Sequence, residues 1–360
     1  MLSPTINTTL DELTNSFAEL IAINSFAYTC NNTVVGYLPD DPTWLASVRS
    51  RIGQLSTAAA SWFDIDPDIR KPLILSFINY ATTFEGVTQQ VQNDTIKTSD
   101  EWITVFQTVL LPAINDSLEK TQKAQLDANT FFQPFKNIIP LIDQSIQEGW
   151  KELAAEEQEM VDIATTLGAL KQEVAGLESE LTSDMISSGK SYVSSEVTLM
   201  YRLLSLGEAV SFLSVGSLAL TLGVGIYDMI STSDKIINDL KKIAVLQLKA
   251  SNAAQAAAGS KLVLQMLYNM DKAFVGINDQ LGALTTLWQT EKNKVQSAID
   301  ALEAKANPNT LLDLVTMPTA NANWQKINDF SEKLTTFHTA SGKPVVLEPK
   351  TSNLKIVSYN

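Results

Sequence analysis

The stretch AVSFLSVGSLALTLGVGIY, residues 209–227, contains no charged residue and is bracketed by Glu208 and Asp228. As a helix, a segment of this length would extend ~29 Å, close to the ~30 Å hydrocarbon core of a bilayer. Its branched aliphatic and phenylalanine side chains together contribute about −3 to −5 kcal/mol on the insertion scale, partly offset by glycines and hydroxyls. Such a marginal span suits a segment that is soluble first and inserted later. The residues predicted to enter a membrane are Val210, Phe212, Leu213, Val215, Leu218, Leu220, Leu222, Val224 and Ile226.

Small residues within this stretch allow two conformations. Gly207, Ser211, Ser214, Thr221 and Gly225 share one helical face, which lets membrane helices approach closely. A glycine followed by a small polar residue also interrupts the stretch and is typical of a type II′ hairpin turn between residues 210–215 and 218–224. Helix and β-hairpin both stay open. The predicted turn or hinge residues are Gly207, Gly216, Ser217, Gly223 and Gly225.

Two long proline-free segments flank the stretch, from Ile142 to Leu204 and from Ser233 to Lys305. Continuous helices over them would be ~90 Å and ~110 Å long. Apolar residues recur in each at alternating spacings of three and four, the pattern of a heptad seam. The seams are Met160, Ile163, Leu167, Leu170, Val174, Leu177 and Leu181, and Leu267, Met270, Phe274, Ile277, Leu281, Leu284 and Trp288. An ordinary helical bundle would show such seams too, but antiparallel pairing here places the uncharged stretch at the tip of a rod.

Helical periodicity also dominates the rest of the chain. We expect helices over residues 9–29, 43–63, 68–93, 99 to the 120s with a kink at Pro112, and 321–339, with breaks at 64–67 and 131–140. Residues 344–347 and 354–357 look extended, and we expect them to cover an edge or pack along the bundle. The predicted fold is therefore all-α: an elongated bundle of long helices, a small hydrophobic head between the two longest, and a short extended C-terminal tail. Residues 1–200 and 233–360 would form the bundle and residues 201–232 the head.

An inserted segment needs a companion that returns across or along the membrane, and the chain holds only one apolar span. We expect this companion to be an amphipathic arm that lines a pore while residues 209–227 face lipid. Its apolar side would carry Val193, Val197, Met200 and Leu204, with Glu196 and Arg202 toward water.

Composition excludes several functions. A net charge of −14 argues against a nucleic-acid binder and disfavours electrostatic docking on anionic lipid. Cys30 and His338 are the only cysteine and histidine, so no intrachain disulfide, His/Cys metal cluster or serine–histidine triad is supported. No phosphate-binding loop occurs. The sequence predicts no catalytic residue, no metal, no cofactor and no enzymatic activity.

The N-terminal residues MLSPT lack the basic and apolar regions of a secretory signal peptide. If the protein acts outside its cell, we expect release by lysis, a dedicated exporter or a processed leader.

Two interpretations of the uncharged stretch compete with membrane insertion: a buried core helix or hairpin, and a contact with a hydrophobic partner. Long amphipathic rods offer no globular interior for a helix that is apolar all round, which favours the membrane interpretation.

A stretch such as Ala209 to Tyr227 between the heptads Met160 to Leu181 and Leu267 to Trp288 resembles the α-helical pore-forming toxins of the cytolysin A superfamily. That group includes haemolysin BL and non-haemolytic enterotoxin components and some insecticidal crystal proteins. The resemblance implies a secreted or released soluble monomer whose head opens on a target-cell membrane, where subunits form a ring. Implied partners are membrane lipid, further copies of the chain and, in some members, partner toxin subunits. The alternative is a membrane-anchored tethering coiled-coil protein, which would need detergent for purification.

Overall fold

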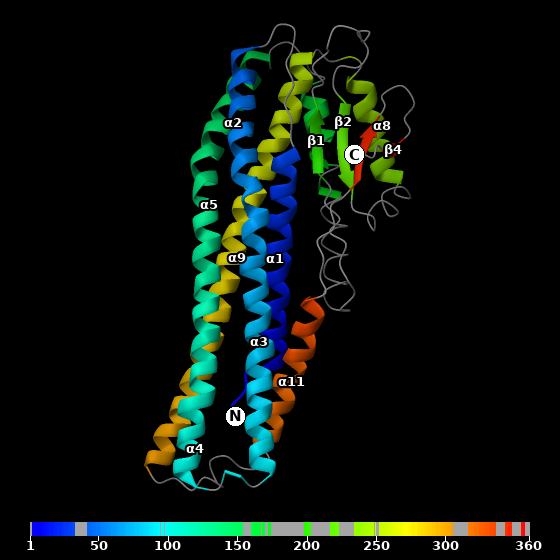
Figure 1. Cartoon of the computed structure of the whole chain (residues 1–360). Coiled ribbons are helices and arrows are strands. Elements are labelled where there is room, and N and C mark those ends of the chain that lie inside the picture. Colours follow the sequence, from blue (N-terminus) through cyan, green and yellow to red (C-terminus); the bar gives the residue numbers. More distant parts are fainter. Residues whose placement is uncertain are drawn as a thin grey trace.

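The chain forms long helices and one small sheet in the computed structural model (Figure 1). The structure describes residues 2–32, 42–93, 95–96, 98–153, 160–166, 168–169, 172–173, 198–202, 217–222, 234–247, 249, 252–304, 316–335, 343–347 and 354–356. The helices are α1 (Ile6–Asn32), α2 (Thr43–Ala60), α3 (Trp62–Gln92), α4 (Ser99–Val105), the π-helix η1 (Phe106–Leu110), α5 (Leu111–Leu153), α8 (Asp234–Gln247), α9 (Asn252–Glu303) and α11 (Thr316–Thr335). The strands are β1 (Thr198–Arg202), β2 (Ser217–Leu222), β3 (Lys343–Leu347) and β4 (Leu354–Ile356).

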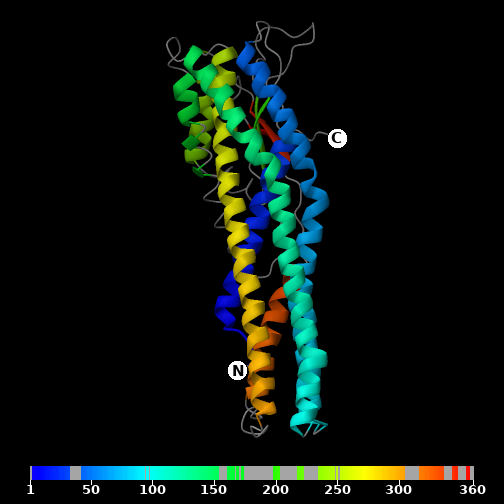
Figure 2. The same cartoon turned by 90° about the vertical axis from the view of Figure 1, so that its left-hand side faces the viewer.

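The long helices lie side by side in an elongated bundle, which confirms the predicted architecture (Figures 1 and 2). Helix α5 packs against α9, α3 and α2, while α1 packs against α9 and α11 against α3. Contacts along α5 and α9 run in opposite directions: Trp150 meets Ala257, Asp143 meets Tyr268 and Gln125 meets Asn278. The part of the first predicted rod that lies in α5 therefore pairs antiparallel with the second, as expected.

The second heptad seam is buried through most of its length. Phe274, Ile277, Leu281, Leu284 and Trp288 are all in the core, and Val295 and Leu302 continue it. Met160 and Ile163 of the first seam are buried too. The five later residues of that seam, and the burial of Leu267 and Met270, lie outside the described residues and side chains. Among the described elements, the helix that packs most extensively on α9 is α5, which ends at Leu153, before the predicted first seam begins at Met160.

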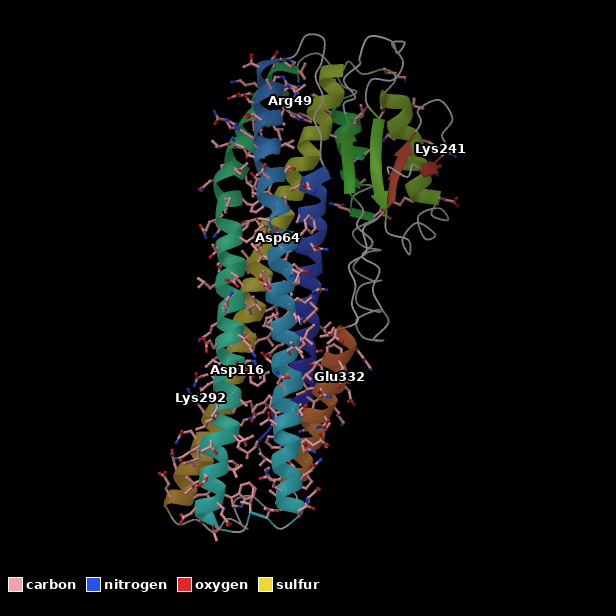
Figure 3. All side chains as sticks on the ribbon, viewed as in Figure 1. Arg49, Asp64, Asp116, Lys241, Lys292 and Glu332 are labelled. Carbon is pink, nitrogen blue, oxygen red and sulfur yellow. The ribbon has the colours of Figure 1, made fainter. Side chains whose placement is uncertain are left out.

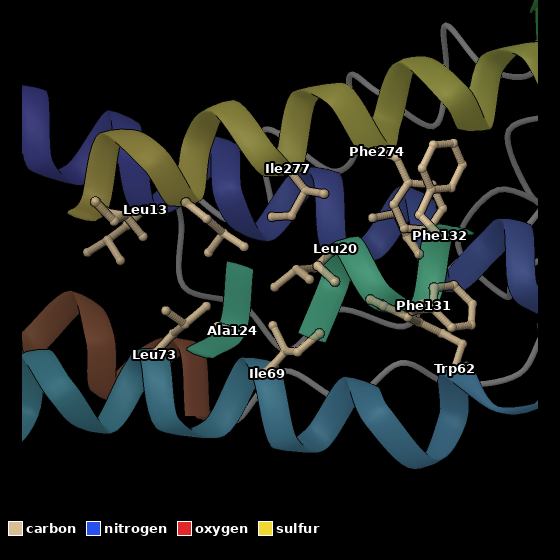
Figure 4. Close-up of a cluster of buried hydrophobic side chains, with 14 of the residues drawn as sticks. Leu13, Leu20, Trp62, Ile69, Leu73, Ala124, Phe131, Phe132, Phe274 and Ile277 are labelled. Carbon is tan, nitrogen blue, oxygen red and sulfur yellow. The ribbon is translucent and has the colours of Figure 1, made fainter. Parts of the chain in front are cut away.

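Aromatic rings fill the centre of the bundle. Phe132 on α5 and Phe274 on α9 stack with centroids 4.1 Å apart, and Phe131 lies 4.9 Å from Trp62 on α3 (Figure 4). Rings of this size bury large apolar areas and dominate the energy of a core. The aromatic contacts thus hold α3, α5 and α9 together at one level.

Charged residues cover the outside of the bundle, where they remain hydrated. Asp64, Asp116 and Glu332 are exposed on the helices of the bundle, and Lys241 is exposed on α8 (Figure 3). Ion pairs between residues four apart, such as Lys120 with Asp116 at 2.6 Å, follow the helix surface. Exposed pairs of this kind contribute only about 0.3–0.5 kcal/mol each.

A cluster of side-chain amides lies on the α5–α9 interface, where Gln125 and Asn278 are half-buried and Asn129 is exposed. The Gln125 side-chain amide donates to the backbone and side-chain oxygens of Asn278 at 3.2 and 3.0 Å. The Asn129 amide donates to the same Asn278 Oδ1 at 2.9 Å. Three hydrogen bonds therefore meet at a single residue of α9.

The break predicted at residues 64–67 occurs at Ser61 instead, between α2 and α3, and the break predicted at residues 131–140 is wrong. Helix α3 continues through Pro67 and Pro72, and α5 continues through Pro134 and Pro140. Each proline removes one backbone donor and frees the carbonyl four residues earlier. Pro67, Pro134 and Pro140 are exposed, so water can satisfy the freed carbonyls and the helices persist.

The distortion expected at Pro112 occurs just before it, as the π-helix η1. The Leu111 N–H donates to the Phe106 carbonyl, one residue further back than in an α-helix. The helical run opens at Ser99 as expected, where Thr98 and Glu101 form a reciprocal capping box.

The helix expected over residues 233–305 is two helices, α8 and α9, with a turn at Lys249. Ser251 and Asn252 precede the alanine-rich start of α9, and both types favour helix N-termini over helix interiors. Helix α8 thus lies beside the sheet and away from the axis of α9 (Figure 1).

Candidate membrane-insertion site

The sheet lies beside one end of the bundle, next to the C-terminal end of α1 and the N-terminal end of α9 (Figure 1). Strand β1 contacts both of these helices. The opposite end of the bundle carries α4 and the end of α9 (Figure 1). Strand β2 belongs to the uncharged stretch, so the described part of that stretch lies beside one end of the rod.

The sheet has the order β1-β2-β3-β4, and every neighbouring pair is antiparallel. Strand β1 aligns Thr198 with Thr221 and Arg202 with Ser217. Strand β3 aligns Lys343 with Leu222 and Val346 with Ala219. Strand β1 crosses the predicted start of the head at residue 201, strand β2 lies inside the predicted head (residues 201–232), and strands β3 and β4 come from the C-terminal tail. The sheet therefore joins the predicted head to residues outside it.

The structure describes only part of the predicted insertion residues. Leu218, Leu220 and Leu222 lie in β2, and Ser217 is its first residue. The others lie outside the described residues: Val210, Phe212, Leu213, Val215, Val224 and Ile226, with the hinge glycines Gly207, Gly216, Gly223 and Gly225. Their roles stay predictions.

The predicted hairpin turn at Gly216 and Ser217 falls partly outside the described residues, as do residues 210–215. Ser217 pairs with Arg202, and the described partners of β2 are β1 on one edge and β3 on the other. The sequence correctly allowed a strand after Gly216, but the strand's partners lie further away in the chain.

The predicted amphipathic arm is a strand where it is described. Met200 and Arg202 belong to β1, while Val193, Glu196, Val197 and Leu204 lie outside the described residues. The three-and-four spacing of the arm's apolar residues suggested a helix. Threonine and tyrosine favour strands, so Thr198 and Tyr201 are the residues from which strand β1 could have been predicted. A helical, pore-lining arm therefore concerns another state and stays a prediction.

The extended tail covers one edge of β2, one of the two positions expected for it. Strand β3 pairs along β2, and β4 pairs in turn with β3, aligning Val345 with Ile356 and Leu347 with Leu354. An uncovered strand edge would present unpaired N–H and C=O groups that invite aggregation. The tail thus protects the apolar stretch at β2.

Close contacts tie α2, α5 and α9 together at the bundle end beside the sheet. The Trp150 indole N–H of α5 donates to the Ala257 carbonyl of α9 at 2.9 Å. A Cβ added at Gly149 would lie 2.4 Å from the ring of Trp44 on α2, so only glycine fits there. The end of the bundle beside the sheet is therefore closely packed.

Residues before and after the sheet's first two strands also meet. The Lys235 ammonium at the start of α8 pairs with the Glu173 carboxylate, which precedes β1 in the chain. This ion pair is exposed and adds little energy. Its importance is geometric, because it shows that the two chain segments that enter and leave the head lie together.

A buried carboxylate lies in the bundle, far along α9 from the sheet. Glu291 is 2 % exposed and accepts a hydrogen bond of 2.6 Å from Lys294 Nζ. Burial raises the pKa of Glu291, and the hydrogen bond and charge of Lys294 oppose that rise. Burial, and then the charge of Glu291, raises the pKa of Tyr80. Lys294 also donates to the Ser3 carbonyl, so this cluster fastens the N-terminal segment to α9.

The described residues offer no metal site, since no group of three histidine, cysteine or acidic side chains comes together among them. Within the same part of the chain, no helix combines the length and hydropathy needed to cross a bilayer.

Comparison with known proteins gives a relative along the whole chain. No family model and no curated protein sequence matches it. Among solved structures, motility associated killing factor B from Vibrio cholerae, also described as the cytotoxin MakB, is 35 % identical with a TM-score of 0.82. The match covers 99 % of this chain and 100 % of that one.

More distant structures share the fold. AhlB of the tripartite α-pore-forming toxin from Aeromonas hydrophila has a TM-score of 0.61 at 10 % identity, covering 91 % of this chain and 92 % of its own. The Bacillus cereus HblL1 toxin component has a TM-score of 0.53 at 13 % identity, covering 92 % of this chain and 96 % of its own. With identity to killing factor B above 30 % over nearly the whole length, the chain belongs to the family of that cytotoxin and has the fold of the cytolysin A superfamily of α-pore-forming toxins.

Proposed function

We propose that this protein is a toxin or toxin component that converts from a soluble form to a membrane-inserted oligomeric pore. The observation that carries the proposal is the 35 % identity to a cytotoxin along the whole chain. The uncharged stretch adds a mechanism, because its described part lies at one end of a rigid bundle. No enzymatic step is needed for this function.

In this mechanism, strand β2 leaves the sheet and residues 209–227 enter the target membrane, with Leu218 and Leu220 near the centre of the inserted segment. Backbone groups in hydrocarbon must be paired internally, so the segment crosses as a helix or within a closed barrel. The segment after residue 193 follows as the amphipathic arm. Further copies of the chain, and partner subunits like those of the tripartite toxins that share the fold, complete the ring.

The direct test is release of a trapped dye from phosphatidylcholine vesicles containing cholesterol. Zwitterionic lipid is the appropriate choice because the chain carries a net charge of −14. We expect purified protein to release dye and to remain with the vesicles during flotation. Protein that neither releases dye nor floats with the vesicles, at any concentration up to micromolar, would contradict the proposal.

A further inference from the structure

Strand β2 is enclosed by partners on both edges. On one side β1 pairs with five of its six residues, from Ser217 to Thr221. On the other side β3 aligns with the four residues Ala219, Leu220, Thr221 and Leu222. The centre of the segment proposed to insert is therefore held in a sheet between an element that precedes it and an element from the far end of the chain.

Strand β3 is fastened to the bundle through α11. Helix α11 packs against α3 and α1, and its Trp324 is fully buried. The Trp324 indole N–H donates to the Leu2 carbonyl at 3.0 Å. Lys343 follows Thr335, the last residue of α11, by eight positions. A fully extended chain of that length reaches at most ~28 Å, so the two residues cannot lie further apart than this. While α11 is docked, β3 stays close to the bundle.

The tail strands are also unsuited to hydrocarbon. Lys343 is aligned with Leu222, and Lys355 of β4 is aligned with Val346. Lysine near the centre of a bilayer is strongly unfavourable, and a two-stranded tail would bring unpaired edges with it. Strand β2 therefore cannot carry β3 and β4 into a membrane as a unit.

We propose that β3 is a latch: its pairing with β2 holds the insertion segment in the sheet and must break before that segment enters a membrane. This inference rests on the function proposed above and adds its regulation. Breaking the pairing frees the backbone groups of β2, which are satisfied again only when the segment becomes helical or pairs with another strand. When β2 separates from β3 and inserts, it therefore exchanges its hydrogen bonds with β3 for new hydrogen bonds in the inserted state. The membrane surface favours this exchange.

The test locks the latch with a disulfide. Facing residues of antiparallel strands alternate between a wide and a close spacing, so two variants are made, Ala219→Cys with Val346→Cys and Leu220→Cys with Val345→Cys. One of them has the closer spacing that suits a disulfide. The native Cys30 is buried, and burial raises the pKa of its thiol, so it stays out of the exchange.

The matched control is Val346→Cys with Lys355→Cys, which cross-links β3 to β4 and leaves β2 free. We expect oxidation to reduce dye release by the β2–β3 variant at least tenfold, reduction to restore it, and the control to lyse equally in both states. Release by the cross-linked β2–β3 variant at the rate of its reduced form overturns the latch.

Strand separation is measured independently of lysis by adding oxidant after the vesicles. The cross-link between positions 219 and 346 should then form in much lower yield than in solution, while the cross-link between positions 346 and 355 is unchanged. An unchanged 219–346 yield on vesicles overturns the latch. Absence of dye release from the unmodified chain counts against the proposed function instead, and the cross-link yield still decides the latch.

Discussion

The indole rings of Trp288 on α9 and Trp324 on α11 stack with centroids 5.9 Å apart and planes within 10° of parallel. Tyr80 of α3 lies edge-on to both rings. These three side chains join α11, which precedes the tail, to α3 and α9.

Replacing Trp324 by alanine should lower the free energy of unfolding by about 3–5 kcal/mol, because it leaves a large cavity and an unpaired Leu2 carbonyl. Urea denaturation measures this loss. Trp324→Phe keeps much of the ring volume and should cost less. Equal stability of the alanine variant and the native chain would show that α11 is not anchored through this side chain.

Gly149, which contacts Trp44, and Gly53, which has open space beside it, provide a matched pair of variants. Gly149→Ala should destabilise the fold by about 1–3 kcal/mol, since the new methyl group would overlap the Trp44 ring. Gly53→Ala, in α2 with no atom within 4 Å of the added Cβ, should be neutral or stabilise by up to about 1 kcal/mol. The melting temperature should fall for Gly149→Ala and should stay the same or rise for Gly53→Ala. A loss of stability in both would mean that the tight contact at Trp44 is not the cause.

Insertion itself is tested by Leu218→Asp and Leu220→Asp. A charged residue near the centre of an inserted helix costs about 2.5–3.5 kcal/mol, comparable to the whole apolar gain of the stretch, so dye release should be lost. Leu220→Ile is the matched control and should lyse normally. Circular dichroism should show an unchanged helical bundle, because β2 pairs with strands β1 and β3. Native lysis by the folded aspartate variants would mean that another segment inserts.

The buried carboxylate predicts a pH dependence of stability. Burial raises the pKa of Glu291 in the folded state, so the folded chain holds that proton more tightly than the unfolded chain. The contribution of this group to stability is therefore fully present below its ordinary pKa and is lost as pH rises through the raised value.

Glu291→Gln removes that titration while keeping an acceptor for Lys294. The difference in melting temperature, native minus variant, should fall with rising pH above 4.5, the ordinary value. A difference for Glu291→Gln that is constant from pH 4 to 8 would contradict the raised pKa.

Local patterns in the sequence predicted the bundle well. The seam from Phe274 to Trp288 is buried as expected, because a three-and-four spacing makes one apolar face whatever the neighbouring helix is. The same patterns failed at Pro67 and Pro134, since sequence alone does not reveal that these residues face water.

The site was harder to predict because its contacts are distant in sequence. Ala219 faces Val346, and no periodicity within either segment encodes that pairing. Met200 lies in a strand although the spacing of its apolar neighbours is helical, because pairing with Ala219 satisfies the backbone there. Sequence located the segment and the extended tail, whereas their partnership required the tertiary structure.

The amide cluster at Asn278 restricts how motion at the head can travel along the bundle. If α9 slid past α5 by one turn, the amides of Gln125 and Asn129 would lose the acceptor that they share on Asn278. Sliding of one rod along the other would therefore break three hydrogen bonds at this level. The antiparallel register of α5 and α9 is thus fixed by polar contacts at three levels: Gln125 with Asn278, Asp143 with Tyr268 and Trp150 with Ala257.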